Sequence, residues 1–179
     1  MKAKSIILFL ILLTGSTYFV LDRHLFFYGK STFSFYELLP ENIKPENQPE
    51  FGRGFVLRDE HGMSLAGNEV KYGDAHSKIE EVIKYGFNSD LLIAEIRNDK
   101  DEIYFREFGK NQNPASKADI SSRLIYEYEI AALGKLKWVE INDKKNYRPM
   151  VVARGLLALT LIGLFITLTV LTISKKNVE

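Results

Sequence analysis

Three histidines are the side chains best suited to metal binding or acid–base catalysis in this chain: His24, His61 and His76. His76 follows Asp74 by two residues, and a carboxylate at that spacing could orient an imidazole base or a metal ligand. Polar residues such as these are also typical of the segment directly before a helix. The chain has no cysteine and no His-Glu-x-x-His spacing. We therefore expect no metal site and no cofactor.

Paired acidic residues are the second possible source of chemistry, because two carboxylates can divide the general acid and base roles. Glu80-Glu81 and Asp101-Glu102 are such pairs, but nothing distinguishes them from solvated surface charges. Gly52-Arg53-Gly54 is too short, and lacks the strand-to-helix context, for a phosphate-binding loop. The sequence contains no nucleophile elbow, Walker loop or dinucleotide fingerprint. We expect a protein without catalytic activity, with a hydrolase as the weaker alternative.

Aromatic side chains are the remaining candidates, since the chain contains 12 Phe, 9 Tyr and 1 Trp. Tyrosine and tryptophan are favoured at protein interfaces, where a rigid ring provides contact area at low entropic cost. The candidate partner-binding residues are Tyr104, Tyr126, Tyr128 and Tyr147. Packing in the core is the alternative for each, and it is the expectation for the single tryptophan, Trp138. The pattern favours a protein-binding module.

The segments that carry these residues lie between two apolar ends of the chain. Gly155–Ile173 contains nineteen residues and no charge, close to the ~20 that a helix needs to cross a hydrocarbon core. Arg154 precedes this run, and Lys175 and Lys176 follow it, as expected at the two interfaces of a membrane span. We predict a transmembrane helix over 155–173.

The N-terminal apolar run, Ser5–Leu21, has two interpretations. A basic start, an apolar stretch and the small residues Thr14-Gly15-Ser16 are typical of a secretory signal peptide. However, no Ala-x-Ala cleavage pattern is present, and apolar residues resume through Tyr18–Leu21. We therefore favour an uncleaved transmembrane anchor over 5–21, with a cleaved signal as the alternative.

The charges that flank the two runs predict their orientation. Lys2 and Lys4 precede the first run and two lysines follow the second, and basic residues favour the cytoplasmic side. Both termini should then be cytoplasmic and the central domain extracytoplasmic, which means periplasmic in a Gram-negative cell. From Asp22 to Arg148 there are 19 Lys+Arg and 22 Asp+Glu, a net charge of −3. Nucleic acid is an unsuitable partner for such a faintly acidic domain.

The first half of the central region has a connector followed by short elements. Two interpretations fit the aromatic stretch after the first apolar run: Phe27 and Tyr28 form part of an interfacial aromatic belt, or Thr32–Leu38 is a first strand whose aromatic residues pack inward. Pro40, Pro45 and Pro49 then predict an extended connector, with the compact domain starting near Glu50. Further along, the patterns predict strands over Phe51–Arg58 and Met63–Ala66 and, from a capping box at Ser77–Glu80, a helix over Ile79–Gly86.

The second half contains the clearest strand pair. Leu91–Arg97 and Glu102–Phe108 flank the turn-forming residues Asn98–Asp101 and predict a hairpin. Asp119 could cap a helix over Ile120–Leu133, with a strand at Tyr126–Ile130 as the alternative. A final alternating strand is predicted over Lys135–Asn142.

Together these patterns predict an α+β protein: a small antiparallel sheet with one or two helices, flanked by an N-terminal and a C-terminal transmembrane helix. The expected order is a span at 5–21, a juxtamembrane connector at 22–49, the extracytoplasmic domain at 50–142, a juxtamembrane segment at 143–154, a span at 155–173 and a cytoplasmic tail at 174–179.

Two functional hypotheses fit this layout. The first is a membrane-anchored extracytoplasmic module that binds a protein partner, such as an immunity or inhibitor protein at the cell envelope. The second is an accessory subunit that docks its spans on a larger membrane complex. Gly163 and Thr167 form a small-xxx-small pair that could pack against another helix in that case.

The predicted orientation can be tested with reporter fusions. A reporter fused after Glu179 should be active only in the cytoplasm, and one inserted within Asn111–Ser116 only outside it, because basic flanks keep both termini inside. The opposite pattern of activities would contradict the orientation.

Overall fold

The computed structural model describes residues 2–48, 54–67, 70, 79–110, 120–141 and 144–176. The protein is α+β, with two antiparallel sheets and helices at both ends of the chain. It divides into two compact units: one contains residues 1–25 and 145–179, and the other is Phe26–Lys144. We refer to them as the helical unit and the sheet unit.

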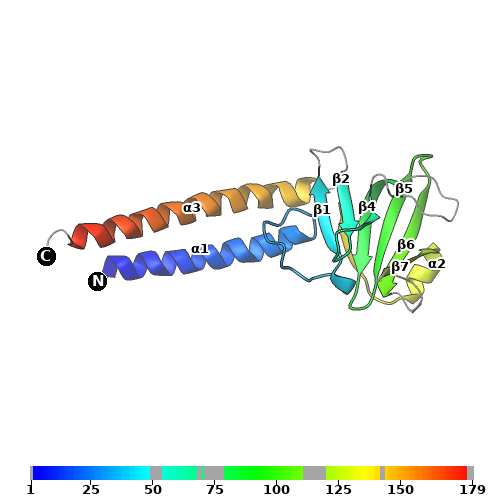
Figure 1. Ribbon diagram of the computed structural model, residues 1–179, viewed down its shortest axis with the longest axis horizontal. Coiled ribbons are helices and arrows are strands. Elements are labelled where there is room, and N and C mark those ends of the chain that lie inside the picture. Colours follow the sequence, from blue (N-terminus) through cyan, green and yellow to red (C-terminus); the bar gives the residue numbers. More distant parts are fainter. Residues whose placement is uncertain are drawn as a thin grey trace. The chain divides into compact units, whose positions relative to one another are not determined.

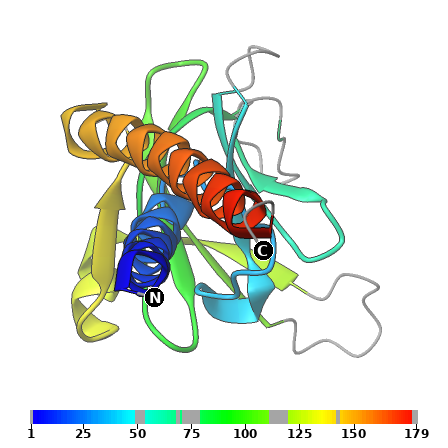
Figure 2. The ribbon, with the colours of Figure 1, turned by 90° about the vertical axis from the view of Figure 1, so that its left-hand side faces the viewer.

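The helical unit is formed by α1, Lys2–Phe26, and α3, Lys144–Lys176 (Figure 1). The two helices run in opposite directions, with both chain termini at the same end of the pair, and Figure 2 shows that their axes are inclined to one another. Ala3–Phe26 and Tyr147–Ser174 are long and apolar enough to cross a membrane. Both are longer than the predicted spans. The α3 threonines bond back within the helix, as Thr167 Oγ1 does to the Gly163 carbonyl at 2.9 Å.

A small antiparallel sheet in the order β1-β2-β3 opens the sheet unit. Its strands are β1, Lys44–Gln48, β2, Gly54–Arg58, and β3, Ser64–Ala66. The strands predicted at Phe51–Arg58 and Met63–Ala66 are therefore confirmed where the chain is described. The stretch expected to be a connector is structured, because a 3-10 turn at Pro40–Asn42 (η1) leads into β1 and Pro45 lies in this edge strand.

The larger sheet has the order β7-β6-β5-β4-β8, with every neighbouring pair antiparallel. Its strands are β4, Ile79–Phe87, β5, Leu92–Asn98, β6, Ile103–Lys110, β7, Ile120–Ile125, and β8, Lys137–Glu140. The predicted hairpin, β5 with β6, and the final strand, β8, are confirmed.

The helix predicted over Ile79–Gly86 is wrong, because this segment is the strand β4. The pairing with β5 shifts register between Val82 and Lys84, so that Ile83 is an extra residue in a β-bulge. The bulge brings Val82 and Tyr85, three residues apart, onto the same buried face. The helix prediction rested on Ile79, Val82 and Ile83 at positions i, i+3 and i+4. Register shifts between Ile79 and Glu81 and between Val82 and Lys84 show that this spacing belongs to an interrupted strand.

The helix predicted over Ile120–Leu133 is also wrong in its first half, and the alternative strand at Tyr126–Ile130 is wrong as well. The chain forms β7 as far as Ile125 and then α2, Glu127–Ala132. The change occurs at Tyr126, whose backbone N–H donates to Glu129 Oε2 at 2.8 Å and so satisfies a free donor at the helix start. The proposed cap, Asp119, lies outside the described residues.

The strand predicted over Thr32–Leu38 is wrong, since this segment is irregular, and its aromatic residues pack inward only in part, because Phe35 is 61% exposed. Tyr36 is buried and Phe33 packs against the same core, as do Phe27 and Tyr28. The hydroxyl of Tyr85 donates to the Phe27 carbonyl at 2.6 Å. The compact sheet unit therefore begins at Phe26, rather than near Glu50.

Trp138 is not a core residue, contrary to the expectation. In β8 it pairs with Gly86, whereas Val139 pairs with Tyr85. Because Tyr85 faces the core, Val139 and Ile141 are buried, and Trp138 lies on the opposite face with 39% of its surface exposed. Its ring lies against Gly86, where an added Cβ would be 2.9 Å from ring atoms.

Gly29 is predicted to be essential for the sheet unit. Its φ is +64°, and an added Cβ would lie 2.6 Å from the Glu46 carbonyl carbon and 2.7 Å from the Asn47 nitrogen. Gly54, with φ +63° and no atom of the described residues within 4 Å of an added Cβ, is a matched control. We expect Gly54→Ala to cost about 1–2 kcal/mol from the left-handed backbone alone, and Gly29→Ala to cost clearly more, because β1 must also move. Thermal unfolding of the full chain in detergent measures both. Equal shifts in melting temperature would show that the close approach to β1 is unimportant.

Candidate functional site

The predicted chemistry-bearing residues that the structure describes lie in separate elements of the fold. The described part of the chain holds no group of three or more His, Asp or Glu side chains placed to bind a metal. His61 is exposed, and its Nε2 lies 3.8 Å from Glu60 Oε1 in the turn between β2 and β3. Asp74 and His76 lie outside the described residues. Glu102 belongs to the hairpin turn, where it accepts a hydrogen bond from Asn98 Nδ2 at 2.8 Å.

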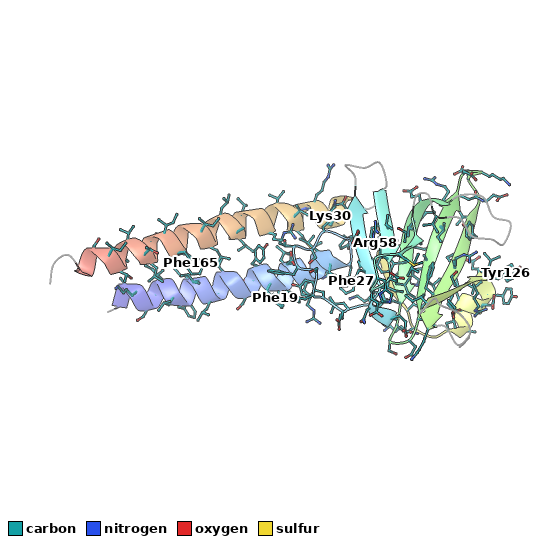
Figure 3. All side chains as sticks on the ribbon, viewed as in Figure 1. Phe19, Phe27, Lys30, Arg58, Tyr126 and Phe165 are labelled. Atoms are coloured by element: carbon teal, nitrogen blue, oxygen red, sulfur yellow. The ribbon has the colours of Figure 1, made fainter. Side chains whose placement is uncertain are left out.

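Two of the four predicted partner-binding tyrosines form an exposed pair at the start of α2. Tyr126 is 58% exposed and Tyr128 is 74% exposed. Their ring centroids are 5.7 Å apart and their planes differ by 5°, so the rings stack. Tyr126 projects from the α2 end of the sheet unit (Figure 3). We call Tyr126 and Tyr128 the tyrosine pair.

Ionic contacts fix the backbone beneath the tyrosine pair. Arg123 of β7 contacts Glu107 of β6 at 2.7 Å and Glu129 of α2 at 3.0 Å. The hydrogen bonds from the Tyr126 amide and from Arg123 lower the pKa of Glu129. A carboxyl group whose pKa is lower in the folded than in the unfolded state stabilises the fold at pH values above the unfolded-state pKa. This stabilisation is lost as the pH falls through the folded-state pKa. Glu129 is therefore ionised at neutral pH and holds the start of α2 in place.

The other two predicted tyrosines lie elsewhere. Tyr104 of β6 is half-buried and packs against the core of the sheet unit. Tyr147 lies near the start of α3 and is also half-buried. The structure thus brings together only Tyr126 and Tyr128, which are two residues apart in the sequence.

The outer face of the large sheet displays a further aromatic residue that the sequence placed inside. Trp138 lies beside Lys84, whose Nζ is 5.2 Å from the centre of the indole ring. Lys84 also contacts Glu95 at 2.8 Å, so the tryptophan borders a charged surface. The alternation of β8 was visible in the sequence, but which of its two faces is buried was not.

In the helical unit, Gly163 and Thr167 do not contribute to a close helix contact. An added Cβ at Gly163 would meet no atom within 4 Å among the described residues, and the Thr167 side chain is exposed. Their predicted role in packing against another helix stays a prediction.

An ion pair joins the two helices instead. Arg154 Nη1 of α3 donates to Asp22 Oδ1 of α1 at 2.6 Å. The Asp22 side chain has no exposed surface, and that of Arg154 is 18% exposed. Sequence reasoning assigned Arg154 to the membrane interface and missed its partner. The signal was a pair of opposite charges at the inner ends of the two apolar runs, 132 residues apart.

Removal of one partner should destabilise the helical unit more than removal of both. Arg154→Ala leaves a buried, unpaired carboxylate and is expected to cost about 3–5 kcal/mol. The double variant Asp22→Ala/Arg154→Ala should recover much of that loss. Thermal unfolding in detergent of the two single variants and the double variant completes this double-mutant cycle. Arg148→Ala, at an exposed site on the same helix, is the control and should change the stability by at most about 0.5 kcal/mol. Purely additive effects of the two substitutions would contradict a functional ion pair.

Comparisons with known protein families, with curated proteins and with solved structures find no match for this chain.

Proposed function

We propose that this protein is a membrane-anchored, non-catalytic module that binds a protein partner through the tyrosine pair. The observation that carries the proposal is the stacking of Tyr126 on Tyr128 with more than half of each side chain exposed. Large exposed aromatic side chains are costly in water, and tyrosine is among the residues that dominate binding energy at protein interfaces.

The pair is also suited to binding because it is already ordered. Each ring limits the rotamers of the other, and the contacts of Arg123 with Glu107 and Glu129 hold the backbone below. Less conformational entropy is then lost when a partner covers the rings. Glu127, exposed between the two tyrosines, favours a partner that presents a basic side chain.

The apolar helices supply the location in this proposal. Basic residues at both chain ends favour cytoplasmic termini and an extracytoplasmic sheet unit. A small binding domain held at that surface would suit an immunity or inhibitor protein that intercepts another protein at the cell envelope. This specific role rests on analogy of architecture.

The alternative is an accessory subunit of a membrane complex, with the helices as the docking surface. An open apolar groove between α1 and α3 supports it, with a volume of about 580 Å³ and walls that include Phe19 and Phe165 (Figure 3). Gly15 and Ser16 also line this groove, and small residues let another helix approach closely.

Site-specific photo-cross-linking in intact cells distinguishes the two roles. A benzophenone amino acid at Tyr128 should cross-link a protein partner, whereas the same group at Met63, which is 62% exposed on the β2–β3 turn, should not. Cross-links only from Ile162, on the exposed surface of α3, would favour the accessory subunit. Equal yields from Tyr128 and Met63 would contradict the proposed surface.

Once the partner has been identified, substitution of the tyrosine pair measures how much these two side chains contribute to the affinity. Tyr128→Ala should weaken binding about 30-fold, the effect of a hot spot of about 2 kcal/mol, without lowering the melting temperature, because the side chain is exposed. Met63→Ala is the matched control and should leave affinity unchanged. Affinity that survives replacement of both tyrosines would exclude the pair as the contact surface.

A further inference from the structure

A second surface, unrelated to the tyrosine pair, lies where the chain leaves α1. Phe26 is the last residue of α1 and of the segment able to span a membrane. Its ring contacts that of Tyr36 at 5.9 Å, and Tyr36 contacts Phe35 at 4.9 Å. Phe35 in turn stacks on Phe33 at 5.1 Å. Phe35 is therefore two ring contacts away from the end of the span, and 61% of it is exposed.

The backbone holds this aromatic group close to Phe26. The Gly29 N–H donates to the Phe26 carbonyl at 2.9 Å, which reverses the chain directly after α1. The Gly29 carbonyl then accepts a hydrogen bond from the Asn47 N–H of β1 at 3.2 Å. Ser31 Oγ bonds both the amide and the carbonyl of Phe33. These hydrogen bonds order the segment that carries Phe35 and so fix the position of its exposed side chain.

A cavity of about 170 Å³ lies beside this group, large enough for roughly five water molecules. Phe26, Phe33 and Pro45 form the apolar part of its wall, and Gly29 also lines it. The polar lining residues are Ser31, Thr32, Ser34, Lys44 and Glu46. The Lys44 ammonium donates to the Ser34 carbonyl at 3.1 Å and, with three donor hydrogens, can also bind an anionic oxygen. The charge of Glu46 is balanced by Arg58 at 2.9 Å. Lys44 thus leaves the cavity net positive.

We propose that this cavity and the Phe33–Phe35 pair bind the headgroup of an anionic phospholipid in the bilayer that α1 crosses. A residue that ends a membrane span lies at the boundary between hydrocarbon and headgroups, so the cavity that Phe26 lines opens at the depth of lipid phosphates. Exposed aromatic rings settle in this layer, and lysine attracts anionic lipids. The sheet unit then contacts the membrane surface as well as being tethered to it.

Spin labelling tests the depth of Phe35, and the absence of cysteine makes single-site labelling clean. Full-length Phe35→Cys and Ile103→Cys variants carry the label at sites that are 61% and 59% exposed. In lipid nanodiscs, the label at position 35 should be shielded from a water-soluble nickel relaxant and accessible to oxygen in the lipid. The label at position 103 should be accessible to nickel. Equal nickel accessibility at both sites would overturn the proposal.

The proposed role of the Lys44 charge is tested by measuring which lipids the protein retains. In nanodiscs that mix phosphatidylglycerol with phosphatidylcholine, Lys44→Gln should reduce the preference for phosphatidylglycerol about fivefold. Lys44→Arg should keep this preference, and Lys100→Gln, in an exposed turn, should not change it. Loss of the preference in Lys44→Arg as well would indicate a structural lysine and overturn the proposal. Equal displacement of the lipid by inorganic phosphate would assign the cavity to a free anion. Neither result would affect the tyrosine pair, which is tested by partner cross-linking.

Discussion

The side chain of Tyr85 holds the sheet unit together, because it joins its own strand to two parts of the chain that lie far away in the sequence. It lies in β4 with no exposed surface, its ring stacks on Phe55 of the small sheet at 5.8 Å, and its hydroxyl donates to the carbonyl of Phe27. Burial raises the pKa of Tyr85 well above its usual value, so the hydroxyl remains a donor at physiological pH. The two sheets and the segment that follows α1 are thereby packed around one residue. The cavity lined by Phe26 and Phe33 depends on this packing, because its walls belong to the segment that Tyr85 anchors at Phe27.

The two faces of the large sheet carry different side chains, although the buried Arg106 shares the core face with Phe108. One face supplies the core, whereas the other carries cross-strand ion pairs such as Lys84–Glu95 and Arg123–Glu107. Such pairs are worth little individually when exposed, but they orient the side chains and the backbone around them. Arg123 uses this face to hold α2 and, with it, the tyrosine pair. The same division explains why Trp138 is displayed, since it shares a face with Lys84 rather than with Tyr85.

In the helical unit, an ion pair joins two apolar helices. A carboxylate without exposed surface, as in Asp22, requires a partner, and Arg154 supplies it from the other helix. Apolar side chains give two helices in lipid little reason to associate, so a polar contact of this kind is well suited to pair them. The lipid-headgroup cavity and the tyrosine pair belong to the other unit, and each can be tested without reference to the ion pair.

The sequence by itself determined the features that depend on local composition. The two apolar helices, the β5–β6 hairpin and the last strand follow from uninterrupted runs or from regular alternation, and the stacking tyrosines were already candidates because of their residue type. Tertiary structure decided the features that depend on which residues contact one another in the fold. The bulge at Ile83 turned an apparent helix into β4, the Glu129 cap placed α2 after β7, and pairing with Gly86 turned Trp138 outward. Asp22 and Arg154, which are far apart in the sequence, became partners only when the helices met. For Trp138 and for the Asp22–Arg154 pair the deciding contacts join residues far apart in the sequence, which local patterns do not encode, whereas the Glu129 cap is local and was outweighed by the apparent helix pattern before it.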